Sequence, residues 1–422
     1  MVNVLVVGSG GREHAMGWKL TQSTKVDKIY HAPGNGGTLN NVDIPSDDIE
    51  GLAKFAKENN CITVVGPEVP LSMGIVDEFT KRGLLIFGPT KDAAQLESSK
   101  IWAKNFMKRN DILTARFEVF DDPKKAIEFA KSVDYQLVVK ADGLAAGKGV
   151  IVCNDSFETI DAINKILVEK NFGNAGSRII LEERIDGIEA SFIAISDGNV
   201  AYPMATSQDH KRIYDDDKGP NTGGMGTYSP TPVIDDSTAK EIQKNVIEKT
   251  IHCMKKEGIV FKGFLYAGIM LKDGKPYVLE FNARMGDPEC QPIMMRMDSD
   301  LFDYIQASID GTLSLLPLIS WKEQSAVCVV LASKGYPESF SKNEEILGLD
   351  ITTPSSQVFH SGTRKENGKI LTSGGRVLGV TATGDTLEDA IKNVYARVDA
   401  ITWPSKYCRL DIGKKGLSSY FT

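Results

Sequence analysis

The sequence predicts an α/β protein with an N-terminal parallel sheet, a central α+β region and a small C-terminal α+β domain. Two observations support this prediction. Short runs of β-branched residues alternate with helical stretches in the N-terminal quarter, and the alternation resumes near the C-terminus, as in strands joined by helices. The 422 residues, 41% of them hydrophobic, can build about two to four domains with separate cores.

The N-terminal segment shows the alternation most clearly. We expect strands over 3–7, 28–32, 61–65 and 84–87, and helices over 13–22 and 71–82. Each strand ends in a turn-rich tip, and the tips begin at Gly8, Pro33, Gly66 and Gly88. Ligands of open α/β sheets bind at the carboxyl ends of the strands. The four tips therefore predict a binding site along one edge of this sheet.

The rest of the chain divides into a lid-like insertion, a central region and a terminal domain. We expect a helix over 93–109, a small α+β lid with strands over 136–140, 149–153 and 178–183 and a helix over 157–170, then a helix over 238–257 and strands over 264–271 and 276–281. The final hundred residues or so read as a separate domain. Its expected elements are strands over 326–332 and 376–383 and a helix over 387–401.

Composition and charge exclude several classes of protein. The formal charge of −7 and the pI near 5.5 oppose a nucleic-acid or anionic-membrane partner, which would require a clustered basic surface. No long apolar run predicts a membrane helix, and the start lacks the basic leader of a secretory signal. Six dispersed cysteines without a C-x-x-C pair predict buried thiols rather than a zinc or redox centre, and hence a cytoplasmic protein.

The first glycine turn, Gly8-Ser-Gly-Gly-Arg-Glu13, follows a strand and opens a helix. In that context backbone N–H groups can bind a phosphate. Glu13, however, stands where the dinucleotide fingerprint requires its third glycine, and Tyr30 and His31 stand where a ribose-binding acid is expected. An NAD site is therefore disfavoured. The turn either binds a small phosphorylated ligand or has only a packing role.

A second glycine-rich segment, Lys140-Ala-Asp-Gly-Leu-Ala-Ala-Gly-Lys-Gly149, also follows an expected strand. Its glycines would let main-chain N–H groups approach a polyphosphate. It is not a Walker loop, because Gly149 occupies the position of the metal-binding Ser or Thr and a strand follows instead of a helix. The segment predicts a hairpin flap over phosphates, with an ordinary flexible hairpin as the alternative.

A third pattern places Glu280 and Asn282 on one face of a strand, since side chains alternate with period two. Both are oxygen ligands suited to Mg²⁺ held jointly with nucleotide phosphates. Arg284 and Asp287 follow closely, and phosphoryl transfer needs such positive charge beside the metal. A charged strand end at the surface is the alternative. With the flap, the pattern predicts an ATP-driven ligase that activates a carboxylate as an acyl phosphate.

Together these segments resemble the ATP-grasp superfamily and, within it, the family of phosphoribosylamine–glycine ligases, over nearly the whole chain. The resemblance is carried, in order, by the stretches 8–14, 32–35, 65–68, 87–90, 140–149, 207–212, 219–226 and 280–289. It implies an ATP-grasp fold with an N-terminal Rossmann-like domain for the phosphoribosylamine over 1–103, an ATP-grasp domain over 104–324 with a mobile lid at about 115–190, and a C-terminal domain over 325–422.

The resemblance also implies roles for individual residues. The nucleotide would be bound by Lys104, Lys140, Gly147, Lys148, Gly149, Glu182, Glu183, Ile185 and Glu189, of which Glu182 to Ile185 form the adenine hinge and Glu189 takes the ribose. The substrates would be bound by Gly10, Gly11, Arg12, Asn35, Gly66, Pro67, Glu68, Asp209, Lys211, Arg212, Arg284 and Asp287. Catalysis would depend on Arg284, Asp287 and Lys140, and Glu280 and Asn282 would hold Mg²⁺ or Mn²⁺. Gly268 or a neighbour on the preceding strand stands where many superfamily members carry a further metal-binding carboxylate.

The activity implied is the ATP-dependent ligation of glycine to 5-phosphoribosylamine through glycyl phosphate in purine biosynthesis, by a cytoplasmic monomer. Two rivals stay open at the level of sequence. A biotin-carboxylase-like or other purine-pathway ATP-grasp enzyme would accept a different carboxylate. A non-catalytic nucleotide-binding protein of the same fold would bind ATP without turnover.

Overall fold

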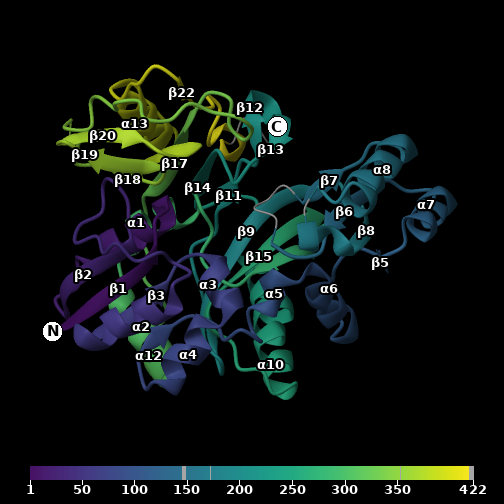
Figure 1. Cartoon of the computed structure of the whole chain (residues 1–422), viewed down its shortest axis with the longest axis horizontal. Helices are drawn as coiled ribbons and strands as arrows, with labels where there is room; N and C mark the ends of the chain where they lie inside the picture. Colours follow the sequence, from purple (N-terminus) through teal and green to yellow (C-terminus); the bar gives the residue numbers. More distant parts are fainter. Residues whose placement is uncertain (145–148, 172, 352, 418–422) are drawn as a thin grey trace.

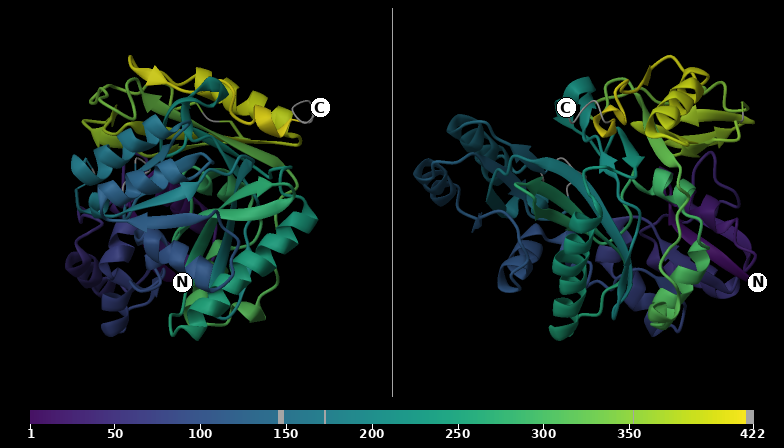
Figure 2. Two further views of the ribbon diagram at one scale, coloured as in Figure 1. Left: turned by 90° about the vertical axis from the view of Figure 1, so that its right-hand side faces the viewer. Right: turned by 180° about the vertical axis from the view of Figure 1, so that it is seen from behind.

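The computed structural model describes residues 1–144, 149–171, 173–351 and 353–417 (Figure 1). Within these residues, four sheets of four or more strands carry the architecture. One belongs to the N-terminal segment, one to the centre, one to the lid and one to the C-terminal region, and Figure 2 shows the lid projecting from the other three. The predicted α/β class is confirmed.

The N-terminal sheet is parallel throughout, with the strand order β2-β1-β3-β4, which confirms the expected parallel sheet. Its strands are β1 (Val2–Gly8), β2 (Val26–Pro33), β3 (Cys61–Val65) and β4 (Ile86–Phe87), and its helices are α1 (Gly11–Leu20), α2 (Ile49–Glu58), α3 (Glu68–Met73) and α4 (Ile75–Lys81). The single helix predicted over 71–82 is wrong. Gly74, with φ of 93°, separates α3 from α4, a backbone conformation that glycine adopts at little cost.

The central sheet is antiparallel, in the order β10-β9-β15-β16. Its strands are β9 (Ile188–Asp197), β10 (Ala201–Pro203), β15 (Lys262–Lys272) and β16 (Lys275–Asn282). The helices of this region are α5 (Gln95–Ser98), α6 (Lys100–Arg109), α9 (Asp236–Ile242) and α10 (Lys249–Lys256), with the π-helical turn η4 (Gln243–Glu248) between the last two. The helix expected over 93–109 is interrupted at Ser99, whose hydroxyl caps α6 by accepting from the N–H of Trp102.

The lid is a four-stranded antiparallel sheet in the order β5-β8-β6-β7, with helices packed on it. Its elements are β5 (Phe117–Phe120), α7 (Pro123–Ser132), β6 (Leu137–Ala141), β7 (Val150–Val152), α8 (Ser156–Ile163), η1 (Asn164–Val168), η2 (Gly173–Ser177) and β8 (Ile179–Glu183). Val139, Ile163 and Leu181 belong to a hydrophobic cluster that lies wholly within the lid. The lid therefore packs around a core of its own.

The C-terminal sheet has the order β11-β14-β17-β21-β18, with β22 paired to β17. Its strands are β11 (Gln208–Asp209), β14 (Gly226–Ser229), β17 (Ser325–Ser333), β18 (Ser356–His360), β21 (Arg376–Gly384) and β22 (Lys406–Tyr407), and α13 (Leu387–Asp399) packs on it. The remaining elements are α11 (Cys290–Arg296), α12 (Leu301–Asp310), the ribbons β12 (Arg212–Tyr214) with β13 (Lys218–Asn221) and β19 (Thr363–Glu366) with β20 (Lys369–Thr372), and the short helices η3 (Asp215–Asp217), η5 (Leu313–Leu315) and η6 (Lys414–Gly416). Strands β11 and β14 come from the segment between β10 and β15 of the central sheet. This segment therefore belongs to the C-terminal sheet.

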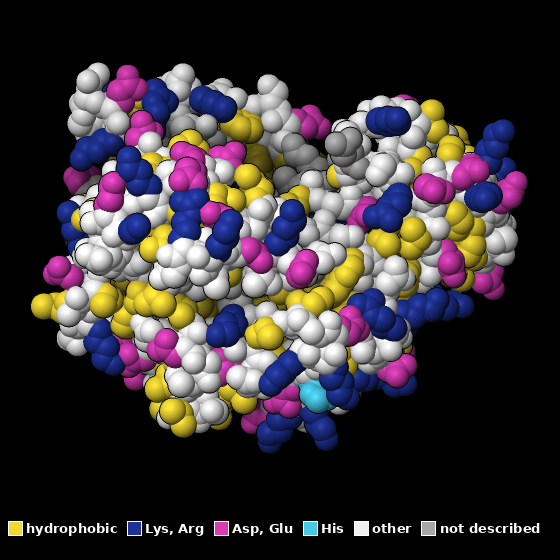
Figure 3. Space-filling view, turned by 60° about the horizontal axis from the view of Figure 1, so that its bottom comes forward, with side chains coloured by type: hydrophobic (Ala, Val, Ile, Leu, Met, Phe, Trp, Pro, Cys, Tyr) yellow, Lys and Arg dark blue, Asp and Glu magenta, His cyan; other side chains and the backbone are white. Residues whose placement is uncertain are grey.

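The charged side chains are mixed on the face that Figure 3 displays. Lys and Arg alternate with Asp and Glu there, and no continuous basic patch covers that face. Among the described residues, no helix is both long enough and apolar enough to cross a membrane.

Candidate active site

A cavity of about 910 Å³ lies where the lid, the central sheet, the N-terminal tips and the C-terminal sheet meet. Most of the residues predicted for the site line it. They are Arg12, Glu68, Lys104, Lys140, Gly149, Glu182, Glu183, Ile185, Glu189, Asp209, Lys211, Arg212, Glu280, Asn282, Arg284 and Asp287. The first glycine turn, the segment 140–149 and the segment 280–289 are distant in sequence, and each therefore contributes residues to one cavity.

The other predicted site residues lie elsewhere. Gly10 and Asn35 line a second cavity of about 460 Å³ between the N-terminal tips and the C-terminal sheet. Gly11, Gly66 and Pro67 line neither cavity. Gly147 and Lys148 lie outside the described residues.

The first glycine turn is organised around Glu13. Its carboxylate accepts from the N–H of Gly10 at 2.6 Å and from Nε of Arg12 at 2.6 Å. A Cβ at Gly66 would lie 2.0 Å from Glu13 Oε1, so glycine is needed there for packing. The residue that breaks the dinucleotide fingerprint thus caps helix α1 by accepting from the N–H of Gly10. Arg12, which also donates to the carbonyl of Met285, faces the main cavity.

Two lysines predicted to bind phosphate meet at one buried carboxylate. Glu182 on β8 pairs with Nζ of Lys104 on α6 at 2.9 Å and with Nζ of Lys140 on β6 at 2.8 Å. Lys104 also donates to Thr114 Oγ1 at 2.6 Å. One carboxylate between two ammonium groups leaves a net positive charge at the cavity wall, which favours a polyphosphate. Glu182 therefore orients the two lysines with its side chain, a role the hinge prediction did not include.

We expect Lys104 to make the binding of ATP depend on pH. Burial lowers the pKa of Lys104 to about 8, although Glu182 opposes this shift. Lys104 is protonated below that pKa and neutral above it, so ATP affinity is expected to fall about tenfold between pH 7 and pH 9. Titration calorimetry at several pH values measures this. Lys104→Met should bind ATP more weakly but with a flat profile; an unchanged slope in that variant would assign the titration to another group.

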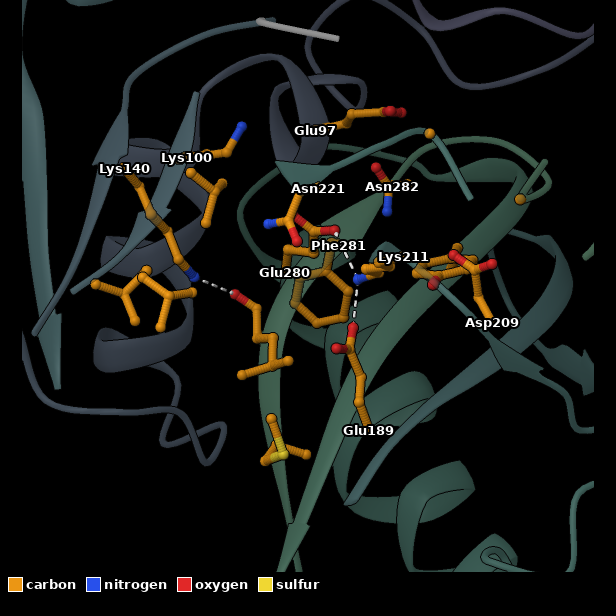
Figure 4. A pocket seen from close by; sticks show the side chains of 18 of the residues that line it. Glu97, Lys100, Lys140, Glu189, Asp209, Lys211, Asn221, Glu280, Phe281 and Asn282 are labelled. Carbon is orange, nitrogen blue, oxygen red and sulfur yellow. Dashed lines mark hydrogen bonds and ion pairs between the residues drawn. The ribbon is translucent and has the colours of Figure 1, made fainter. Parts of the chain in front are cut away.

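Strand β16 presents the predicted metal ligands beside a third lysine. Lys211 pairs with Glu189 and lies 3.9 Å from Glu280 Oε1, as Figure 4 shows. Burial raises the pKa of Glu280, but nearby positive charges led by Lys211 outweigh it and lower the value to about 2, so the side chain is ionised at neutral pH.

The donor set on β16 suits a divalent cation shared with a nucleotide. Glu280 and Asn282 are hard oxygen ligands on one strand face. Gly268 on β15 pairs directly with Glu280, so the position opposite the metal strand offers no second carboxylate. Among the described residues, no group of three or more His, Cys, Asp or Glu side chains could hold an ion by itself. Two side-chain oxygens leave most positions of an octahedral Mg²⁺ ion open, and oxygens of nucleotide phosphates would fill them.

The loop after β16 carries a buried guanidinium and a buried carboxylate. Arg284 Nη2 lies 2.8 Å from Glu97 Oε1, and its Nε lies 3.3 Å from Glu68 Oε2. Asp287 accepts from Gln291 Nε2 at 2.9 Å. Burial raises the pKa of Asp287, but the neighbouring arginines outweigh this and lower it, so Asp287 is an ionised group at the cavity wall.

Several cavity residues were missed by the sequence prediction. Glu97, Lys100, Asn221 and Arg376 all line the main cavity. A polar run, Glu97-Ser-Ser-Lys100, directly before the helix of Lys104 could have indicated the first two. Arg376 had no local signal, yet its Nη1 donates to the carbonyls of Gly223 at 2.6 Å and Asp287 at 2.7 Å.

Comparisons with known proteins agree with this geometry. Models of the phosphoribosylglycinamide synthetase family match the chain in three parts: the N domain over residues 2–97, the ATP-grasp (A) domain over 98–290 and the C domain over 326–415. The chain belongs to this family. It is therefore an ATP-grasp ligase.

Individual relatives span the whole chain. The phosphoribosylamine–glycine ligases of Xanthomonas campestris pv. campestris and Vibrio vulnificus are each 48% identical to it over 425 residues, covering 99% of this chain and 98% and 99% of theirs. The solved phosphoribosylamine–glycine ligase of Thermotoga maritima superposes with a TM-score of 0.87 at 35% identity, covering 97% of this chain and all of that one (100%). A biotin carboxylase domain from Hydrogenobacter thermophilus shares the fold, with a TM-score of 0.73 at 14% identity. The match covers 96% of this chain and 91% of that domain.

Proposed function

We propose that the protein ligates glycine to 5-phosphoribosylamine at the expense of ATP, yielding glycinamide ribonucleotide, ADP and phosphate in purine biosynthesis. The observation that carries this proposal is the convergence, in one cavity, of the Lys104–Glu182–Lys140 cluster, the Glu280/Asn282 strand and Arg284. This is the set of charges that activation of a carboxylate by ATP requires. The family membership specifies the carboxylate and the amine.

The nucleotide would lie between the lid and the central sheet. Lys104 and Lys140 bind its phosphates, the segment 182–185 holds the adenine, and Glu189 binds the ribose. Glu280 and Asn282 would hold a divalent ion, Mg²⁺ or Mn²⁺, which would neutralise charge on the phosphates. The Lys211 ion pairs keep both carboxylates fixed before the nucleotide arrives.

Ligation proceeds in two displacements. A carboxylate oxygen of glycine attacks the γ-phosphorus, the bond to the bridging oxygen of ADP breaks, and glycyl phosphate forms beside Arg284. The amine of phosphoribosylamine then attacks the glycyl carbonyl, the C–O bond to phosphate breaks, and the nitrogen loses a proton as the amide forms. Positioning and charge neutralisation supply the catalysis. Closure of the lid keeps water from hydrolysing the acyl phosphate.

The second cavity is the proposed site for the sugar phosphate. Gly10, Asn35, Ser361 and Thr363 line it, so small and polar groups of two domains face each other there. The amide nitrogen of Asn35 donates to the carbonyls of Ser9 and His360, which ties the two walls together. Arg376 lines both cavities and lies where the two substrates would meet.

We also propose that the enzyme acts as a monomer. Sedimentation velocity at assay concentration measures this directly. A dimer as the active species would contradict the proposal.

Measurement of ADP release tests the substrate assignment. With glycine and phosphoribosylamine together, we expect turnover at least about a hundredfold above that with either compound alone, since the acyl phosphate is consumed only when the amine is present. Acetate, β-alanine and bicarbonate serve as competing carboxylates. Equal ADP release with and without phosphoribosylamine would reject the assignment, and stimulation by bicarbonate would favour a biotin-carboxylase-like activity.

A further inference from the structure

Glu97, a residue with no role in the steps above, uses both of its carboxylate oxygens on the loop that follows the metal strand. Oε1 lies 2.8 Å from Nη2 of Arg284, and Oε2 accepts from the N–H of Ala283 at 2.7 Å. The side chain is 7% exposed, and its partner Ala283 is 186 residues away in sequence. In this buried environment, a charge-assisted contact is both strong and geometrically specific.

The two contacts hold the loop at residues 283 and 284, directly after β16. Ala283 lies between Asn282 and Arg284, so one carboxylate holds the backbone directly after the metal strand and the guanidinium beside it. Glu97 itself belongs to α5, and Ser99 then caps α6, the helix that carries Lys104. Glu97 thus connects the phosphate-binding helix with the metal strand.

Glu68 contacts the same guanidinium differently. It lies 3.3 Å from Nε of Arg284, its side chain is 27% exposed, and among the described residues Nε of Arg284 makes no hydrogen bond. Glu97 therefore makes the closer contact with Arg284, at 2.8 Å, while the buried Nε has, within the described part of the chain, only the longer contact with Glu68; the residue as a whole lines the main cavity. A guanidinium held on one edge by a carboxylate presents its other donors in a set direction.

We propose that Glu97 is a positioning residue that aims Arg284 at the transferring phosphoryl group, and that its contact with the N–H of Ala283 holds the carboxylate in place for this role. The inference rests on the role of Arg284 in the proposed function. A glutamine at position 97 has a single acceptor oxygen and cannot serve both Ala283 and Arg284. A shift of about 1 Å in a group that contacts the reacting atoms costs roughly a hundredfold in rate.

A double-mutant cycle tests the proposal. E97Q should lower kcat about 10- to 100-fold and leave the KM for ATP within about twofold, because the lysine cluster is intact. In an R284A background, E97Q should change kcat by less than about threefold, since the group that it positions is gone. The control is E257Q, which removes the carboxylate from a surface pair with Arg109 and should leave kcat unchanged.

Other outcomes distinguish failure of the positioning role of Glu97 from failure of the proposed function. Wild-type kcat in E97Q, or effects of E97Q and R284A that multiply in full, would overturn the positioning role. Wild-type kcat in R284A would instead reject the role of Arg284 in the proposed function. Thermal unfolding of each variant checks the fold. If E97Q lacks a cooperative transition, E97D replaces it in the cycle, because the shorter side chain keeps the charge but cannot reach both partners, and the same additivity criterion applies.

Discussion

Replacement of Glu280 by alanine is expected to abolish ligation almost completely, with kcat lowered by about a thousandfold. Glu280 is ionised and lies on β16 with Asn282, and it is the carboxylate of the pair that would hold the divalent ion. Without it, the charge on the transferring phosphoryl group loses its principal counter-charge from the metal. Steady-state ADP release with saturating glycine and phosphoribosylamine measures the loss.

The same variant separates an enzyme from a binding protein. ATP binding in the absence of metal should change little in Glu280→Ala, because the lysine cluster around Glu182 is intact. Glu118→Ala, which removes an exposed carboxylate from the lid strand β5, is the matched control and should keep the normal rate. Turnover in Glu280→Ala within about threefold of the parent would contradict the metal assignment and favour a non-catalytic role for the strand.

Replacement of Lys140 by methionine is expected to weaken ATP binding and to lower kcat/KM for ATP by about a hundred- to a thousandfold. Lys140 places its ammonium on Glu182 at 2.8 Å and on the carbonyl of Leu279 at 3.2 Å, at the wall of the nucleotide cavity. Methionine keeps the volume of the stem but removes the charge. Glu182 retains Lys104 at 2.9 Å, so the buried carboxylate is not left unpaired and the fold should persist.

Binding and turnover measured together decide the role of Lys140. Calorimetric titration with ATP and the rate of ADP release should both fall, and the melting temperature should drop by only a few degrees. Lys165→Met, which removes a surface ion pair with Asp161 on the lid, serves as the control for loss of a lysine there. Normal ATP affinity combined with a normal rate in Lys140→Met would reject the phosphate-binding role.

The elements that were predicted well are those with a strong local pattern. Strand β3 is buried along its whole length and reads as an apolar run, which is how strands of parallel sheets appear in sequence. The prediction missed β9, the strand that pairs with β15 through most of its length in the central sheet. It also missed α2, whose N-terminus is capped by the carboxylate of Asp48, which accepts from the N–H of Gly51.

Local sequence determined the candidate groups of the site: the glycine-rich tips, the hairpin of β6 and β7 after Lys140 and the shared face of Glu280 and Asn282 follow from spacing along a single strand or turn. Only the tertiary structure decided which charges face one another. Glu182 binds two lysines from different elements, and Glu97 holds Arg284 from far away in the chain. Such pairs form because burial makes an unpaired charge costly, and the partner is whichever opposite charge the packing of the sheets brings near.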